Sequence, residues 1–154
     1  MESLTKKTVL TGIKPTGTPH LGNYIGAIKP ALELAKYDMN NTLYFIADYH
    51  ALTIIKDATK LKNLYYEVAA TWLALGLDPN KVIFYRQSDV PELFELNWIL
   101  ACSTAKGLMN RAHAYKAIVS DNVANGIEDV DTGVNMGLYT YPILMASDIL
   151  MFQT

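Results

Sequence analysis

The residues best suited to phosphate chemistry gather near the start of the chain, around His20. Four of the nine glycines lie between Gly12 and Gly26. This stretch follows a β-type run and precedes a helical pattern, which predicts a strand, a loop and a helix N-terminus, where free amides stabilise an anion. The His20 imidazole could donate to a phosphate oxygen as charge develops there. Neither the G-x-G-x-x-G fingerprint nor a P-loop is present, and an ordinary strand-to-helix turn stays open.

The other two histidines have a weaker chemical context. His50 lies beside Asp48 at the end of an apolar run, where ligand contact and a structural loop role are both open, and His113 is expected at the surface of a polar helix. No two histidines have the i, i+3 or i, i+4 spacing of a helical metal pair, and the single cysteine has no partner nearby. The G-x-S-x-G elbow of serine hydrolases is also lacking. We therefore expect no metal ligands.

A second group of candidate residues lies near residue 150. With Pro142 in the first turn of a predicted helix, the steps from Tyr141 to Met145, Asp148 and Phe152 are 4, 3 and 4, which places them on one helix face. A carboxylate buried among such side chains needs a donor. For Asp148 that donor is either a basic residue elsewhere in the chain or a ligand group, such as an amine or an indole N–H in an aromatic-sized pocket.

Alternating strands and helices must position these residues. Apolar β-forming runs predict strands at residues 8–11, 42–47 and 81–85. Helical spacing predicts helices from Ile25 toward Tyr37, from about residue 59 to Leu75 with Gly76 closing it, and from Pro91 to about Ser103 with Ser88 or Asp89 before it. The β-α-β-α-β-α order predicts a parallel sheet with right-handed crossovers, and hence a Rossmann-like α/β fold.

Two of these helices carry further expectations. Pro30 cannot donate to the carbonyl of Gly26, so we expect a kink or loosened first turns in the first helix. Its predicted buried face consists of Ile25, Ile28, Leu32 and Ala35. The predicted apolar stripe of the second helix consists of Leu61, Leu64, Val68, Trp72 and Leu75.

After the predicted β-α units the pattern is less regular. Gly107 marks a break, residues 108–119 have helical spacing, and the polar stretch 121–133 carries three acidic residues whose spacing is wrong for a calcium loop, so we expect a surface loop.

Bulk composition narrows the function classes. The 154 residues are long enough for one domain or part of one, and 51% are hydrophobic, which favours a filled interior over disorder. A net charge of −2 argues against general electrostatic binding of nucleic acid. Cys102 cannot form an intramolecular disulfide and is expected to be a buried thiol, which fits a reducing cytoplasm. We expect no signal peptide and no membrane span.

Several stretches together resemble one enzyme family. Residues 12–17 (GIKPTG) and 19–26 (PHLGNYIG) resemble the first signature of class I aminoacyl-tRNA synthetases, with His20-Leu21-Gly22-Asn23 where that class has its "HIGH" tetrapeptide. Within the class, residues 48–53 (DYHALT) and 140–150 (TYPILMASDIL) resemble the tryptophanyl branch rather than its tyrosyl sibling. The resemblance covers nearly the whole chain.

This resemblance implies an enzyme that activates tryptophan with ATP and Mg²⁺ to tryptophanyl-adenylate and passes the aminoacyl group to its tRNA. The implied ATP contacts, with His20 assisting the phosphates, are Lys14, Pro15, Thr16, His20, Gly22 and Asn23. In the implied tryptophan pocket Asp148 accepts the indole N–H and Tyr141 binds the α-amino group. The other lining residues are Gly12, His50 and Met145. A cytoplasmic homodimer without membrane or DNA partners is also implied.

Two departures from the family pattern modify this expectation. Asn23 stands in place of the signature's final histidine, and the sequence stops at Thr154 before any "KMSKS"-type lysine loop or anticodon-binding region. By resemblance, residues 1–154 are the N-terminal part of a Rossmann-like catalytic domain that activates tryptophan poorly when alone. The alternatives are a tyrosyl-type synthetase and a non-catalytic nucleotide-binding module.

Overall fold

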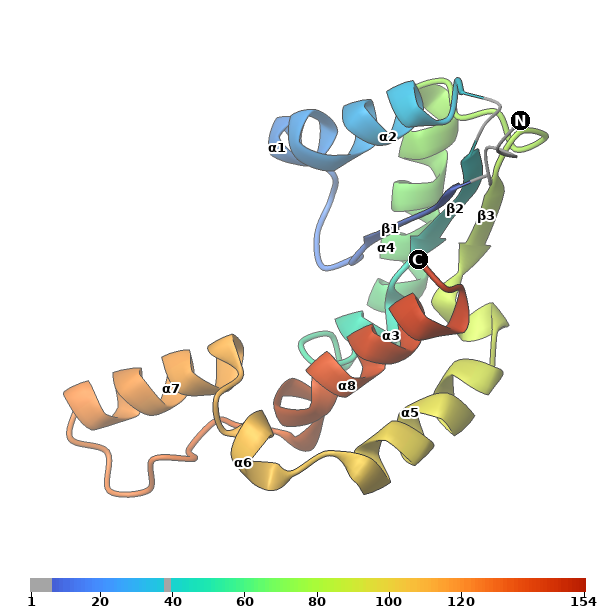
Figure 1. Cartoon of the computed structure of the whole chain (residues 1–154). Coiled ribbons are helices and arrows are strands. Elements are labelled where there is room, and N and C mark those ends of the chain that lie inside the picture. The colour runs from blue at the N-terminus through green and yellow to red at the C-terminus, as the bar shows by residue number, and fades with distance from the viewer. Residues whose placement is uncertain (1–6, 38–39) are drawn as a thin grey trace. The chain divides into compact units, whose positions relative to one another are not determined.

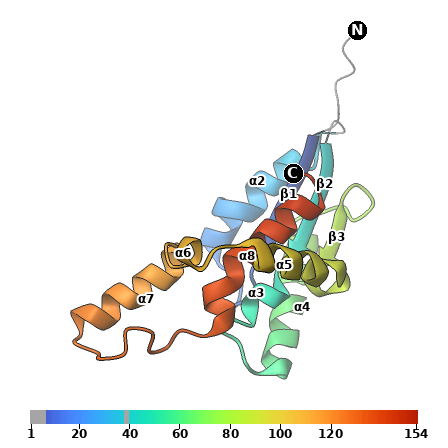
Figure 2. The same cartoon turned by 60° about the horizontal axis from the view of Figure 1, so that its bottom comes forward.

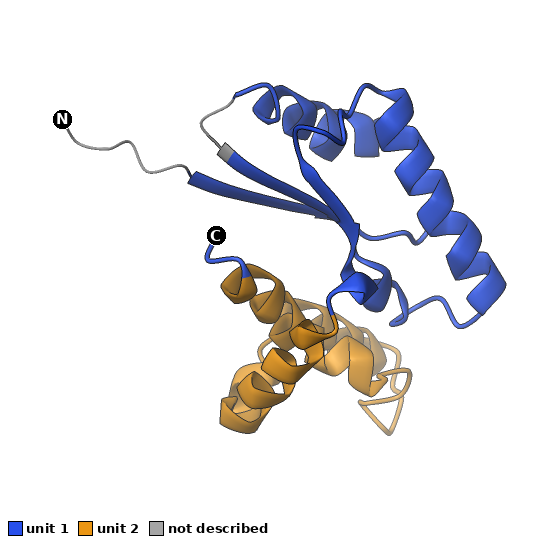
Figure 3. Ribbon diagram, turned by 90° about the vertical axis from the view of Figure 1, so that its right-hand side faces the viewer, with its two compact units in different colours: residues 1–90, 152–154 blue, residues 91–151 orange. Residues whose placement is uncertain are grey.

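A computed structural model describes residues 7–37 and 40–154 of the chain. The chain divides into two compact units, one formed by Met1–Val90 with Phe152–Thr154 and the other by Pro91–Met151 (Figure 3). Each unit is described by itself below.

A three-stranded parallel sheet forms the centre of the first unit (Figure 1). Its strands are β1 (Lys7–Ile13), β2 (Asn40–Ile46) and β3 (Ile83–Arg86), in the order β1-β2-β3. The predicted strands and their parallel pairing are confirmed, although β3 begins two residues later than its apolar run. β1 and β2 pair along their whole length, so that Ile13 lies opposite Ile46 and the chain leaves both strands at the same edge.

Helices α2 (Lys29–Leu34) and α4 (Ala58–Ala74) cover one face of this sheet. Side chains alternate between the two faces of a strand, and Tyr44 and Ile46 of β2 share the face that packs on Ile28 of the π-helical turn before α2 and on Trp72 of α4. The cluster of buried residues at this face consists of Ile13, Ile28, Ala31, Tyr44, Ile46, Val68, Trp72, Leu77 and Val82. The Tyr44 hydroxyl donates to the carbonyl of Ala31, which ties the helix to the sheet at the centre of this cluster.

Helix α4 (Ala58–Ala74) follows the predicted pattern closely. The Asp57 side chain accepts from the backbone N–H of Lys60 at its N-terminus, and Gly76, with φ of +99°, reverses the chain after its last turn. Leu64, Val68 and Trp72 are buried as predicted, whereas Leu75 is exposed because it lies past the end of the helix.

The segment after the glycine-rich loop is one helical run with a π-type turn in its middle. α1 (Leu21–Asn23) continues into η1 (Tyr24–Ile28) and then α2 (Lys29–Leu34), and the Lys29 N–H bonds to the carbonyl of Tyr24. The loosening predicted from Pro30 is therefore confirmed, because proline offers no N–H to Gly26. The predicted burial of Ile25 is wrong, since the wider turn shifts the buried face and Tyr24 packs on the core instead.

The second unit is helical. It consists of α5 (Glu92–Ser103), α6 (Lys106–Met109), α7 (His113–Ala124) and α8 (Met136–Met151). α8 packs along α5, and the two helices lie side by side in both views (Figures 1 and 2). No helix among the described residues is long and apolar enough to cross a bilayer.

The helix predicted from Pro91 to about Ser103 is confirmed as α5, which has Pro91 as its N-cap. Three other expectations for this unit are corrected. The predicted helix 108–119 is two helices, with a break at residues 110–112. α8 begins at Met136, which places Pro142 inside the helix. Cys102 is exposed on α5 rather than buried.

The polar stretch after α7 is exposed, as predicted, but it has internal order. Asn122 is buried, and its side-chain amide donates to the carbonyls of Val130 and Thr132, both at 2.8 Å. The Tyr115 hydroxyl also donates to the Asp131 carboxylate at 2.8 Å. Side chains of α7 therefore fix the path of this loop.

Candidate active site

The loop that follows β1 forms a pocket of about 150 Å³ in the first unit. Four of the six predicted nucleotide contacts line it, namely Lys14, Thr16, His20 and Asn23. Pro15 is buried, and together with Ile13 it anchors the loop to the body of the unit. Further along the loop, the Thr18 hydroxyl donates to the Glu67 carboxylate of α4 at 3.0 Å. The loop is thus held at both ends.

His20 and Asn23 cap the helical run that begins at Leu21. The backbone N–H of Gly22 donates to Nδ1 of His20 at 3.1 Å, and the backbone N–H of His20 donates to Oδ1 of Asn23 at 3.0 Å. This reciprocal pair satisfies two amides that a helix start otherwise leaves open. Because Nδ1 accepts a hydrogen bond, the proton of a neutral imidazole lies on Nε2, which remains a donor for a ligand.

At Gly12 and Gly22 an aromatic or imidazole ring lies too close to the backbone for a Cβ atom. A Cβ on Gly22 would lie 2.9 Å from the His20 ring, so any other residue there would displace the imidazole. A Cβ on Gly12 would lie 2.4 Å from the Phe45 ring, which sits opposite it on β2. Phe45 in turn stacks on Tyr85 at 5.6 Å, so Gly12 leaves room for an aromatic layer on the sheet face away from α4.

Lys14 is linked to the segment that follows β2. Its ammonium donates to the hydroxyl of Thr53 at 3.0 Å, and that hydroxyl donates to the carbonyl of His50 at 2.8 Å. Partial burial lowers the pKa of the Lys14 ammonium. Thr53 closes the DYHALT stretch but was not predicted as a site residue, because the sequence does not show that its hydroxyl meets Lys14. His50 itself is half-buried on the short helix α3 (Asp48–Ala51).

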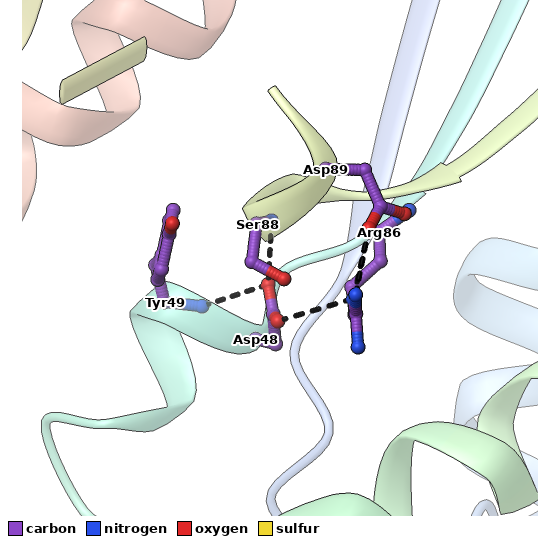
Figure 4. Close-up of polar contacts among 5 residues, drawn as sticks. All are labelled: Asp48, Tyr49, Arg86, Ser88 and Asp89. Atoms are coloured by element: carbon purple, nitrogen blue, oxygen red, sulfur yellow. Dashed lines mark hydrogen bonds and ion pairs between the residues drawn. The ribbon is translucent and has the colours of Figure 1, made fainter. Parts of the chain in front are cut away.

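Asp48 holds the ends of β2 and β3 together (Figure 4). Its carboxylate accepts from the backbone N–H of Tyr49 at 3.1 Å and of Ser88 at 3.0 Å, and lies 3.7 Å from Nε of Arg86. Asp89 binds the same guanidinium at 2.7 Å, which raises the pKa of Arg86. Asp48 is therefore a buried brace between α3 and the turn η2 (Gln87–Asp89).

The second unit carries the three remaining predicted site residues on α8. Asp148 is 3% exposed and its carboxylate is not free, Tyr141 is half-buried, and Met145 is 49% exposed. The structure therefore confirms that Asp148 is buried. Eight predicted site residues belong to the first unit, and these are Gly12, Lys14, Pro15, Thr16, His20, Gly22, Asn23 and His50.

Metal binding finds no support in the described part of the chain. Among residues 7–37 and 40–154 no three His, Cys, Asp or Glu side chains gather as a set of metal ligands.

The family model for class I tRNA synthetases (W and Y) matches residues 2–154. The tryptophan–tRNA ligase of Neisseria meningitidis is 59% identical over 150 residues, which are 97% of this chain and 45% of that protein. The ligase of Pseudomonas putida is 61% identical over 145 residues, which are 94% of this chain and 32% of that protein. The chain thus spans less than half the length of these relatives.

Solved structures of class I tRNA synthetases also match nearly the whole chain. The tryptophanyl-tRNA synthetase of Campylobacter jejuni, complexed with ADP and tryptophan, matches with a TM-score of 0.79 and 46% identity, over 96% of this chain and 43% of that one. The tyrosyl-tRNA synthetase of Archaeoglobus fulgidus matches with a TM-score of 0.71 over 97% of this chain and 44% of that one, at 21% identity, a likeness of fold alone. These matches confirm the predicted Rossmann-like α/β fold.

Because Asp48 is a brace between α3 and η2, we expect Asp48→Ala to destabilise the protein more than Asp89→Ala. Asp48→Ala leaves the backbone amides of Tyr49 and Ser88 without their acceptor and should lower the free energy of unfolding by about 1–3 kcal/mol. Asp89→Ala removes a solvent-exposed partner of the same Arg86 and should cost less than about 1 kcal/mol. Urea unfolding followed by circular dichroism measures both. Equal losses for the two variants would show that Asp48 is not the brace.

Proposed function

The chain belongs to the class I tRNA synthetases of the W and Y family, and from that premise we propose that the protein activates tryptophan with ATP and transfers the aminoacyl group to a tRNA. The observation that carries the proposal is the 59% and 61% identity, along nearly the whole chain, to two tryptophan–tRNA ligases. The pocket after β1 supports it, because Lys14, Thr16 and His20, which can bind phosphate oxygens, are among its lining residues.

On the nucleotide side, the proposal assigns ATP to the pocket after β1. The tryptophan carboxylate attacks the α-phosphorus, the bond to the β-phosphate breaks, and pyrophosphate leaves. This substitution needs positioning and charge stabilisation more than a general base. Lys14 and the Nε2–H of His20 supply positive charge and a donor to the phosphates, with Pro15, Thr16, Gly22 and Asn23 as further contacts. Mg²⁺ would be held chiefly by the phosphates themselves, as is usual for this ion.

On the amino-acid side, the proposal assigns tryptophan to Asp148 and its neighbours. Asp148 would accept the indole N–H, and its burial supports this because a desolvated acceptor discriminates strongly against a ligand without the matching donor. Phenylalanine, which has no ring N–H, would be rejected on this ground. Tyr141 would bind the α-amino group, and Gly12, His50 and Met145 are proposed as further tryptophan contacts.

We further propose that residues 1–154 correspond to the N-terminal part of the catalytic domain. The support is the share of the relatives that the chain covers, 45% and 32% in the two cases above.

The remaining partners follow from the same proposal. A tRNA would receive the aminoacyl group, and two copies of the protein would form a homodimer. Trp98 and Ile99 on α5, which are 70% and 62% exposed, are large apolar side chains that a dimer contact would cover.

We also propose a cytoplasmic location without membrane or DNA partners, where the exposed Cys102 thiol would stay reduced.

The amino-acid substrate is tested by isotope exchange. The full-length protein should exchange labelled pyrophosphate into ATP when tryptophan is present and not when tyrosine or phenylalanine replaces it. Exchange with tyrosine alone would reassign the protein to the tyrosyl branch. Binding of ATP without exchange for any amino acid would instead indicate a non-catalytic nucleotide-binding module.

Replacement of His20 tests the phosphate side of the site. In the full-length protein His20→Ala should lower the rate of tryptophan activation by roughly 10²–10³-fold, the scale for loss of one donor to developing charge. The matched control is His113→Ala on the exposed surface of α7, which should keep the rate of the unmodified protein. An unchanged rate in His20→Ala would remove His20 from the mechanism.

Replacement of Asp148 tests the tryptophan side. Asp148→Ala should weaken tryptophan binding while ATP binding stays nearly intact, because only the indole loses its acceptor. Calorimetric titration of each ligand separates the two effects, with Asp121→Ala as an exposed acidic control on α7. Equal loss of both affinities would indicate that Asp148 serves the stability of the fold through an internal salt bridge.

A further inference from the structure

Three groups form a short hydrogen-bonded relay across the carboxyl edge of the sheet. Nζ of Lys14 donates to Oγ1 of Thr53 at 3.0 Å, and Oγ1 of Thr53 donates to the carbonyl of His50 at 2.8 Å. Lys14 and Thr53 are 39 positions apart in sequence and belong to segments that follow β1 and β2. The relay therefore joins the predicted nucleotide loop to the segment that carries a predicted tryptophan contact.

The direction of these bonds defines what Thr53 does. A hydroxyl has one proton and two acceptor lone pairs, and here the proton is directed to the His50 carbonyl. The lone pairs are thereby left for the Lys14 ammonium. That ammonium has three donors, so the bond to Thr53 leaves two for oxygens of a ligand.

We propose that Thr53 is a positioning residue that holds the Lys14 ammonium at the edge of the sheet, where it meets the phosphates of ATP. This inference rests on the proposed function, because it takes Lys14 as a nucleotide contact. A lysine side chain has four rotatable bonds, and ordering it at the moment of binding weakens affinity. Thr53 orders the Lys14 side chain before ATP binds. The hydrogen bond from Thr53 to the His50 carbonyl in turn fixes the position of Thr53 relative to α3.

Thr53 differs from Thr71, whose hydroxyl makes only a local hydrogen bond among those described. The Thr71 hydroxyl on α4 donates to the carbonyl of Glu67 at 2.7 Å, one helical turn away. Thr53 makes a similar local bond but also accepts from a charged group on a distant loop. Thr71→Val is thus a matched control for Thr53→Val, since both exchange a hydroxyl for a methyl group at half-buried positions.

The first measurement is binding of the ATP analogue AMP-PNP with Mg²⁺ to the full-length protein, by calorimetry. Thr53→Val should bind it about threefold to tenfold more weakly, the cost of ordering one long side chain. Thr53→Ser, which keeps the hydroxyl, and Thr71→Val should bind it as the unmodified protein does. Unchanged binding by Thr53→Val would overturn the proposal. Tighter binding would overturn it as well, because Thr53 would then be holding the ammonium away from the phosphates.

A double-mutant cycle then tests whether Thr53 acts through Lys14. In a Lys14→Met background, Thr53→Val should cause no further loss of AMP-PNP affinity, whereas an equal loss in both backgrounds would assign the effect to the fold and overturn the proposal. Thermal unfolding checks each variant, and Thr53→Ala replaces Thr53→Val if the latter does not fold. Because this readout is binding, a protein that shows the cycle but lacks tryptophan-dependent exchange would contradict the proposed function and leave the role of Thr53 intact.

Discussion

The parallel pairing of β1 with β2 along their whole length is the constraint on which the candidate site depends. It brings the ends of two strands to one edge, so the loop after Ile13 and the short helix after Ile46 begin side by side. The backbone N–H of Ala47 donates to the carbonyl of Ile13 at 2.8 Å and continues this pairing into the loops. Lys14 directly follows Ile13, so this pairing places it at the edge where the segment after β2 begins, and there it donates to Thr53 of that segment.

Specific polar side chains hold the chain segments near this edge, in addition to the buried Ile13 and Pro15. His20 and Asn23 define where the helical run starts, and Asp48 binds backbone amides from two different segments. Most of these groups act on backbone atoms, so each restricts the conformation of a loop. A site that stabilises charge in a transition state needs such fixed donors, because they do not have to reorganise as the charge appears.

The elements that sequence predicted best are those with a strong local pattern. The three strands and α4 follow from apolar runs and caps, and the resemblance to the synthetase family follows from motifs around His20 and Asp148. Predictions failed where backbone geometry departs from a regular helix. Ile25 is exposed because the π-type turn before Pro30 shifts the buried face, and α8 includes Pro142 in its interior. The contacts of Thr53 with Lys14 and of Arg86 with Asp48 could not be predicted, since each pair is far apart in sequence and meets only in the folded chain.

The proposed phosphate-binding groups belong to the first unit, and Asp148 belongs to the second. A crystal structure of the full-length protein with tryptophan and AMP-PNP tests both assignments in one measurement. It should show phosphate oxygens within hydrogen-bond distance of Lys14 Nζ and His20 Nε2, and the indole N–H of tryptophan bonded to the Asp148 carboxylate. A nucleotide bound away from the loop after β1, or an indole that donates to another group while Asp148 pairs with a basic side chain, would contradict these assignments.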